Sequence, residues 1–146
     1  MRVYLDICCL KRPFDDQSQP RIHLEAEAVL ALLDASGTHV EFLHAGAHDL
    51  ENDQNPLPSR AARVREWLEN IPSADFADDV LQARTSELIA LGFKNFDALH
   101  LACAEAGGVE VFATCDDRLQ AAAIRHSASL KVRVVNPVDL AREVLP

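Results

Sequence analysis

Short apolar segments alternate with longer helical patterns along the chain, and this alternation limits the folds open to it. Four segments have β-forming character: 2–5, 40–43, 109–112 and 132–135. Helical patterns occupy residues 20–36, 47–52, 59–71, 73–89, 95–106, 117–127 and 137–144. Strands separated by helices form βαβ units, in which helices cover both faces of a parallel sheet. We therefore predict an α/β fold, a three-layer α/β/α sandwich with a central parallel sheet.

Some details of this pattern are specific enough to be checked. A loop is predicted directly after the first strand, continuing through Lys11, Arg12 and Pro13 and the polar run that follows them. The apolar residues expected on buried helix faces are Leu24, Ala28, Ala31 and Leu32 in the first helix, and Val80, Ala83, Leu88 and Ile89 in the helix after Pro72.

Length and composition indicate one ordinary globular domain over residues 1–146. The chain is 49% hydrophobic and 25% charged, and it has no linker, internal repeat or low-complexity tract. No apolar run is long enough for a membrane span and no signal peptide is recognisable, so we expect a cytoplasmic protein. The four cysteines are then expected to be reduced, and without a CxxC spacing a zinc site has little support.

The net charge of -9 argues against a protein that binds nucleic acid by bulk electrostatic attraction. It leaves room for local phosphate contacts. A carboxylate cluster that binds a metal ion would itself add negative charge. Net charge alone therefore does not exclude a protein that acts on nucleic acid, and the sequence motifs are needed to judge this.

Three acids are placed so that they could meet. Asp6 ends the first strand, and Asp116 follows the strand at 109–112. Asp97 lies in the first turn of the helix that leads into the strand at 109–112, and this helix is expected to run antiparallel to that strand. A doubly wound order puts the two strands side by side, and ligands of such sheets bind at the carboxyl ends of the strands. The three carboxylates could therefore converge.

Converging carboxylates repel each other and are costly to bury, and a divalent cation relieves both problems. Oxygen ligands favour Mg²⁺ or Mn²⁺, which activate a bound water and stabilise charge on a phosphate. The expected reaction is phosphodiester hydrolysis. The alternative is that these acids are helix caps and solvated loop charges, as first-turn acids often are.

The motifs YLD, a short helix with Glu51, FDALHLACA and FATCDD, in this order and through the closing VRVVNPVDL, resemble PIN-domain ribonucleases, in particular the VapC-like toxins of VapBC toxin–antitoxin pairs. By this resemblance the four acids of the site are Asp6, Glu51, Asp97 and Asp116. Thr114 matches the hydroxyl residue of the last motif, and Asp117 is an extra, supporting acid. The resemblance further implies an RNA substrate, a homodimer and an antitoxin partner that masks the site.

The chain departs from the family pattern around two of these acids. Ile7 and Cys8 follow Asp6, where the family has a small polar residue, and residues 44–47 lack the serine or threonine that often precedes the helical glutamate. Glu25 and Glu27, on the first long helix, are the alternatives to Glu51.

Other polar residues have functional and ordinary interpretations. Lys11, Arg12 and Arg118 are the best candidates for RNA phosphate contacts, although solvated surface charges would look the same. His48 is expected to be an exposed or hydrogen-bonded histidine rather than a ligand. His100 is expected to be a packed histidine that makes one hydrogen bond.

Three further functions are weighed against a nuclease. A PIN-like protein-binding module that has lost activity would fit the departures around Asp6 and Glu51. A receiver domain is a weaker fit because Lys131 precedes the last strand instead of ending it, and a D-x-D phosphatase fails because Cys8 occupies the second acidic position.

Overall fold

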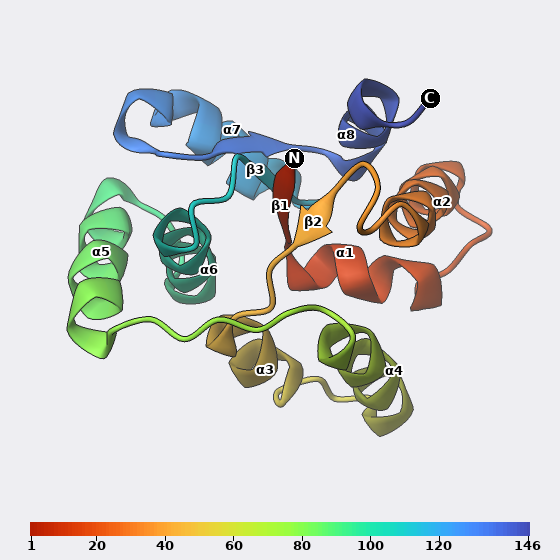
Figure 1. Ribbon diagram of the computed structural model, residues 1–146, viewed down its shortest axis with the longest axis horizontal. Coiled ribbons are helices and arrows are strands. Elements are labelled where there is room, and N and C mark those ends of the chain that lie inside the picture. The colour runs from red at the N-terminus through yellow and green to blue at the C-terminus, as the bar shows by residue number, and fades with distance from the viewer.

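The computed structural model describes residues 1–146 and contains one parallel sheet with the strand order β2-β1-β3-β4 (Figure 1). The strands are β1 (Arg2–Leu5), β2 (Glu41–Phe42), β3 (Val111–Ala113) and β4 (Arg133–Val135). All three strand pairs are parallel, and Leu5 of β1 lies opposite Ala113 of β3. The predicted α/β fold is confirmed.

Helices cover both faces of this sheet, and the strands alternate their side chains between two cores. The helices are α1 (Ile7–Lys11), α2 (Pro20–Asp34), α3 (Gly46–Asn52), α4 (Pro58–Glu69), α5 (Asp78–Leu91), α6 (Asn95–Ala106), α7 (Asp117–Arg125) and α8 (Pro137–Val144), with 3₁₀ turns η1 (Arg12–Phe14) and η2 (Ser127–Ser129). Val3 and Leu5 pack with residues of α1, α2, α4 and α8. Tyr4 and Phe112 pack with residues of α3, α5, α6 and α7. This arrangement is consistent with the predicted three-layer sandwich.

The loop predicted directly after the first strand begins instead as a helix. Asp6 is the N-cap of α1, and its carboxylate accepts a hydrogen bond from the Ile7 amide. Ile7, Cys9 and Leu10 are buried, so three core contacts stabilise a helix of only five residues. Pro13 lies in η1, where a fixed φ and a missing amide hydrogen are tolerated at a helix start. The loop is therefore confined to the residues between η1 and α2.

Several residues expected on buried faces are exposed. On α2, Leu24 is 53% exposed and Ala31 faces solvent, whereas Ala28 and Leu32 are buried as predicted. On α5, Val80 is 56% and Ile89 41% exposed, and only Leu88 is fully buried.

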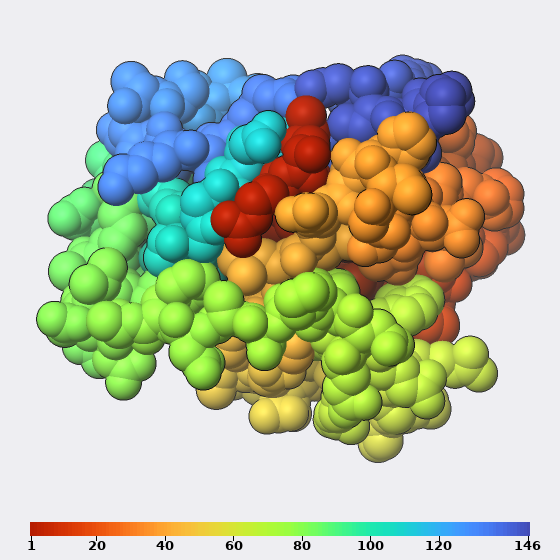
Figure 2. All heavy atoms as spheres, viewed as in Figure 1, coloured from red at the N-terminus to blue at the C-terminus, as the bar shows by residue number.

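The reason for the exposure of α5 is its position. It lies at one edge of the molecule, where it packs mainly against α6 (Figures 1 and 2). A helix with one neighbour buries a narrow stripe, and its other apolar residues remain at the surface.

No helix in the structure is both long and apolar enough to cross a membrane. The four cysteines are all free thiols, as expected.

Candidate metal centre

Two neighbouring strands deliver acids to the same edge of the sheet. Asp6 follows β1 directly, and its amide donates to the carbonyl of Ala113, the last residue of β3. Thr114 and Asp116 come next along the chain after β3. Because parallel strands end at the same edge, the segments after β1 and β3 start side by side. The central position of β1, between β2 and β3, places them in the middle of the sheet.

Asp6 is buried at this edge, with only 5% of the residue exposed. One carboxylate oxygen accepts from the Ile7 amide at 2.8 Å, and the other from the Thr114 hydroxyl at 2.8 Å and the Cys8 thiol at 3.3 Å. Burial raises the pKa of Asp6 well above its usual value, and the Thr114 hydrogen bond only partly opposes this. Asp6 is therefore a helix cap that still presents a buried carboxyl group to the site.

Glu51 of α3 and His100 of α6 approach Asp6 from the other side. One ligand atom from each of these three residues lies within 4.8 Å of the other two. The His100 ring contacts Glu51 through Nε2 at 3.1 Å and the Tyr4 hydroxyl through Nδ1 at 2.5 Å. Burial alone would lower the pKa of His100, but the hydrogen bond to Glu51 and the charge of Asp6 outweigh it and raise the pKa.

Asp97 and Asp116 lie next to this group. Asp97 is in the first turn of α6, three residues before His100 and so on the same face of the helix. Asp116 caps α7, accepting from the Arg118 and Leu119 amides. Both acids line a cavity of about 150 Å³. Burial, and then the charge of Asp116, raise the pKa of Asp97, so the two carboxylates interact.

The acids of this group lack the partners that neutralise acids elsewhere in the molecule. None of Asp6, Glu51, Asp97 and Asp116 forms an ion pair with a lysine or arginine, and the only ion pair among them is Glu51 with His100. Oxygen ligands that converge without an internal cation suit Mg²⁺ or Mn²⁺. The residues present therefore fit a divalent cation held by Asp6 and Glu51, with Asp97 and Asp116 beside it.

Cations line the rim of the same cavity without pairing with its acids. Lys94, Arg118 and Arg125 share its lining with Asp97 and Asp116. Arg118 was among the predicted phosphate contacts, whereas Lys94 and Arg125 were not considered. A negatively charged substrate could meet these side chains just outside the acids.

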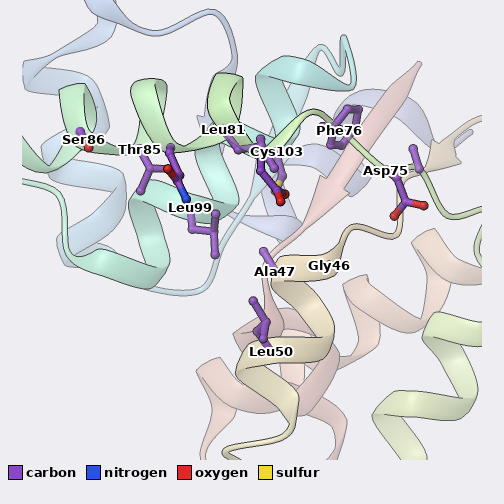
Figure 3. A pocket seen from close by; sticks show the side chains of 13 residues that line it. Gly46, Ala47, Leu50, Asp75, Phe76, Leu81, Thr85, Ser86, Leu99 and Cys103 are labelled. Atoms are coloured by element: carbon purple, nitrogen blue, oxygen red, sulfur yellow. The ribbon is translucent and has the colours of Figure 1, made fainter.

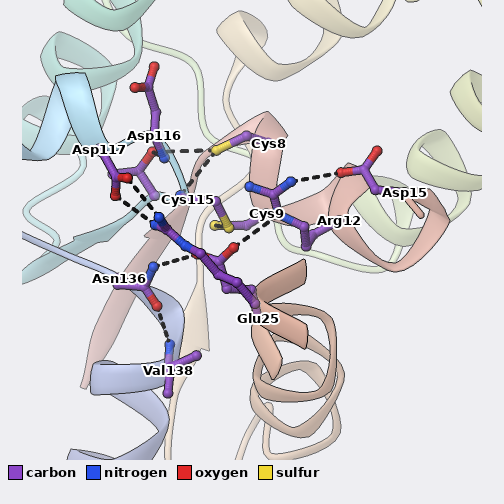
Figure 4. Close-up of polar contacts among 12 residues, drawn as sticks. Cys8, Cys9, Arg12, Asp15, Glu25, Cys115, Asp116, Asp117, Asn136 and Val138 are labelled. Atoms are coloured by element: carbon purple, nitrogen blue, oxygen red, sulfur yellow. Dashed lines mark hydrogen bonds and ion pairs between the residues drawn. The ribbon is translucent and has the colours of Figure 1, made fainter. Parts of the chain in front are cut away.

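Nothing connects three of the predicted site residues with the acid group. Asp117 is exposed and pairs with Arg21 at 2.6 Å (Figure 4). Arg12 pairs with Asp15 at 3.1 Å and approaches Glu25 at 3.4 Å, so its guanidinium is engaged within the protein. Lys11, which ends α1, is half-buried and forms no ion pair.

The alternative glutamates are also away from the acid group. Glu25 is 1% exposed and accepts a hydrogen bond from the Asn136 amide, while Glu27 is exposed on α2. Of the three glutamates considered, Glu51 is the one that lies beside Asp6.

The two histidines differ in a way that the sequence did not predict. His48 is buried and engages both ring nitrogens with the backbone, one with the Leu5 carbonyl and one with the Ala45 amide. Burial lowers the pKa of His48 to about 3, so this histidine is neutral and structural, as expected. His100, by contrast, is part of the acid group. The i, i+3 spacing from Asp97 was the available signal, but the apolar neighbours of His100 favoured a packing role.

Neither a scan against protein-family models nor a search of curated proteins found a match to this chain. The chain is thus an α/β protein with a four-stranded parallel sheet, and its function has to be argued from the site.

Proposed function

We propose that this protein is a metal-dependent endoribonuclease of the PIN type and the toxin of a VapBC-like toxin–antitoxin pair, acting in the cytoplasm. The observation that carries the proposal is the meeting of Asp6, Glu51 and His100, with Asp97 and Asp116 alongside, without a lysine or arginine ion pair at any of the four acids. The order of the motifs along the chain supports the same function.

The acids would hold Mg²⁺ or Mn²⁺, directly or through water. A bound Mg²⁺ or Mn²⁺ lowers the pKa of a coordinated water and stabilises negative charge on a phosphate. Asp6 and Glu51, whose carboxylate oxygens lie within 4.8 Å of each other, would bind the ion, and the hydrogen bond from Thr114 keeps one Asp6 oxygen oriented. Asp97 and Asp116, which are more open, would orient the water or complete the ligand set.

His100 and the rim cations have supporting roles. The His100 ring joins the Tyr4 hydroxyl to Glu51 and therefore fixes the direction of the glutamate. Tyr4 is itself held between the rings of His48 and Phe112, at centroid distances of 4.3 and 5.1 Å. Lys94, Arg118 and Arg125 would bind the phosphates on either side of the cleaved bond, although the chain as a whole is acidic.

Apolar surface outside the acid group supports the protein partners that the resemblance implies, a homodimer and an antitoxin. A cavity of about 460 Å³ lies between α3, α5 and α6, lined by Leu50, Phe76, Leu81 and Leu99 (Figure 3). Leu50, next to Glu51, is 57% exposed. An apolar segment of the antitoxin bound here would lie close to the acids and could place a basic side chain over them.

A second candidate is a PIN-like binding module without activity. The thiol of Cys8, which takes the place of a small polar side chain near Asp6, and the apolar cavity favour it. Such a module would keep the protein contacts and would not cleave RNA.

Cleavage of single-stranded RNA by purified protein distinguishes the two functions. We expect Mn²⁺-dependent cleavage by the wild type and a loss of about a thousandfold in Asp97→Asn, because the metal contributes several kcal/mol to transition-state stabilisation. The variant, purified in parallel, also controls for contaminating ribonucleases. Equal cleavage by both proteins would refute the assignment, and no cleavage by either would favour the binding module.

A further inference from the structure

Three of the four cysteines meet at the sheet edge, beside the acid group. Cys8 and Cys9 lie on α1, and Cys115 follows β3. Their sulfur atoms all lie within 4.8 Å of one another, and those of Cys9 and Cys115 are 3.8 Å apart (Figure 4). The fourth cysteine, Cys103, is on α6 in the other core. Because Cys115 is far along the chain from Cys8 and Cys9, no CxxC spacing indicates the cluster.

The main chain holds these sulfur atoms in place. The Cys9 thiol donates to the carbonyl of Ala113, and the Cys115 amide donates to the sulfur of Cys8, both at 3.3 Å. Cys9 is fully buried and Cys115 is 6% exposed, whereas Cys8 is partly open to solvent. The thiols are thus preorganised, with access from the side of Cys8.

The 3.8 Å separation of the Cys9 and Cys115 sulfur atoms matches a metal site better than a disulfide. Bonded sulfur atoms lie about 2.05 Å apart. Two thiolates on one Zn²⁺, each at about 2.3 Å in tetrahedral geometry, lie roughly 3.8 Å apart. We propose that Cys8, Cys9 and Cys115 form a second metal site, which binds a thiophilic cation of the Zn²⁺ type through three thiolates and leaves the fourth position to solvent.

The surroundings support a charged complex. Three thiolates and a divalent cation carry one net negative charge. The guanidinium of Arg12 lies beside the three cysteines and brings positive charge close to them, although it also pairs with Asp15 and, through Nε, with Glu25 at 3.4 Å (Figure 4). A cation here would also remove the hydrogen bond that Cys8 donates to Asp6 at 3.3 Å, because that thiol would lose its proton. The proposed site is nevertheless separate from the acid group and does not depend on the nuclease function.

The test is titration of the full, reduced chain with Co²⁺, a spectroscopic substitute for Zn²⁺, with a phosphine reductant present. We expect sulfur-to-cobalt charge-transfer absorption that saturates at one ion per chain and is displaced by Zn²⁺. Cys115→Ser should weaken binding by about tenfold or more and reduce the charge-transfer intensity. Cys103→Ser is the matched control and should bind like the wild type.

Two further variants keep the result unambiguous. Cys8→Ser changes the most exposed of the three residues, so it tests the site if Cys115→Ser does not fold. Asp97→Asn should retain full charge-transfer absorption, because the acids are not ligands of this site. Absence of the absorption in the wild type, or its persistence in both Cys8→Ser and Cys115→Ser, would overturn the proposal.

Discussion

Asp6 and Glu25 are both acids buried near the carboxyl ends of the strands, yet their surroundings are opposite. Glu25 is 1% exposed and lies near Arg12 at 3.4 Å and Arg21 at 3.6 Å, and Asn136 donates to it. Asp6 is 5% exposed and accepts hydrogen bonds only from an amide, a hydroxyl and a thiol. Only Glu25 is neutralised within the protein.

This comparison distinguishes acids that stabilise the fold through ion pairs with arginine from acids that have no such partner and could bind a cation. The Glu25 network connects α2 to η1, to Asn136 at the start of α8 and, through Arg21, to Asp117 of α7. The Asp6 group joins β1, α3 and α6 through side chains that form no ion pair with a lysine or an arginine. Of these two buried acids, only Asp6, which no arginine reaches, is a candidate metal ligand.

The comparison is tested most strongly by neutralising one acid from each network. Asp6→Asn should lower RNA cleavage by about a thousandfold, since it removes a proposed metal ligand while an amide oxygen can still cap α1. Asp117→Asn should leave cleavage within about twofold, because its exposed pair with Arg21 contributes little. Initial rates on one RNA at saturating Mn²⁺ measure both. Equal losses in the two variants would show that the networks do not differ in function.

His100 tests how the acid group is oriented. His100→Phe removes the hydrogen bond to Glu51 and should weaken Mn²⁺ binding by about 10- to 100-fold, the usual effect of losing such a supporting contact. His100→Gln, which can still donate to Glu51, should recover part of the affinity. Calorimetric affinities of the folded variants are the measurement. Unchanged affinity in His100→Phe would exclude the positioning role.

Glu25 should matter for stability instead. Glu25→Gln leaves Arg12 and Arg21 with one partner fewer and should reduce the free energy of unfolding by about 1–3 kcal/mol. Urea unfolding at neutral pH gives this value, and cleavage per folded molecule should stay at the wild-type level. A large loss of cleavage without loss of stability would place Glu25 in the active site.

The smallest expected effect is the pH dependence that Asp97 gives to the metal-free protein. Burial and Asp116 raise the pKa of Asp97, so above the usual aspartate pKa of about 3.9 the folded chain binds more protons than the unfolded chain. The free energy of unfolding should therefore fall as the pH rises from about 3.9 to the raised pKa of folded Asp97. In the Asp97→Asn variant the free energy of unfolding should fall less steeply with pH. At pH 7, in the presence of a chelator, the Tm of this variant should be a few degrees higher than that of the wild type. A lower Tm for the variant there would contradict this sign.

Much of the fold followed from the sequence because short apolar strands and helical spacing are local signals. All four strands were predicted near their observed positions, and α6 spans Asn95–Ala106, the range of the predicted helical pattern. The burial of α5 was not predictable in the same way, because Val80 and Ile89 have an apolar pattern but no element to cover them. Which faces are covered depends on tertiary packing.

For the candidate site, the sequence indicated the acids but not their partners. Strand ends pointed to Asp6 and Asp116. The sequence did not show that Arg12 of η1 reaches Glu25, or that Arg21 of α2 reaches Asp117 far along the chain. His100 and the three clustered cysteines were missed because their neighbours are apolar and their contacts span large sequence distances. The i, i+3 spacing placed His100 on the same helix face as Asp97, but no spacing indicates contacts between segments as far apart as these.

The most direct test of the central claim is calorimetric titration of the metal-free protein with Mn²⁺, with the cysteines kept reduced. We predict saturable binding to the wild type and to Glu25→Gln, and binding weakened by about tenfold or more in Asp6→Asn and Asp97→Asn. Equal Mn²⁺ affinity in all four proteins, or no binding to the wild type, would contradict the claim that these acids converge on a cation.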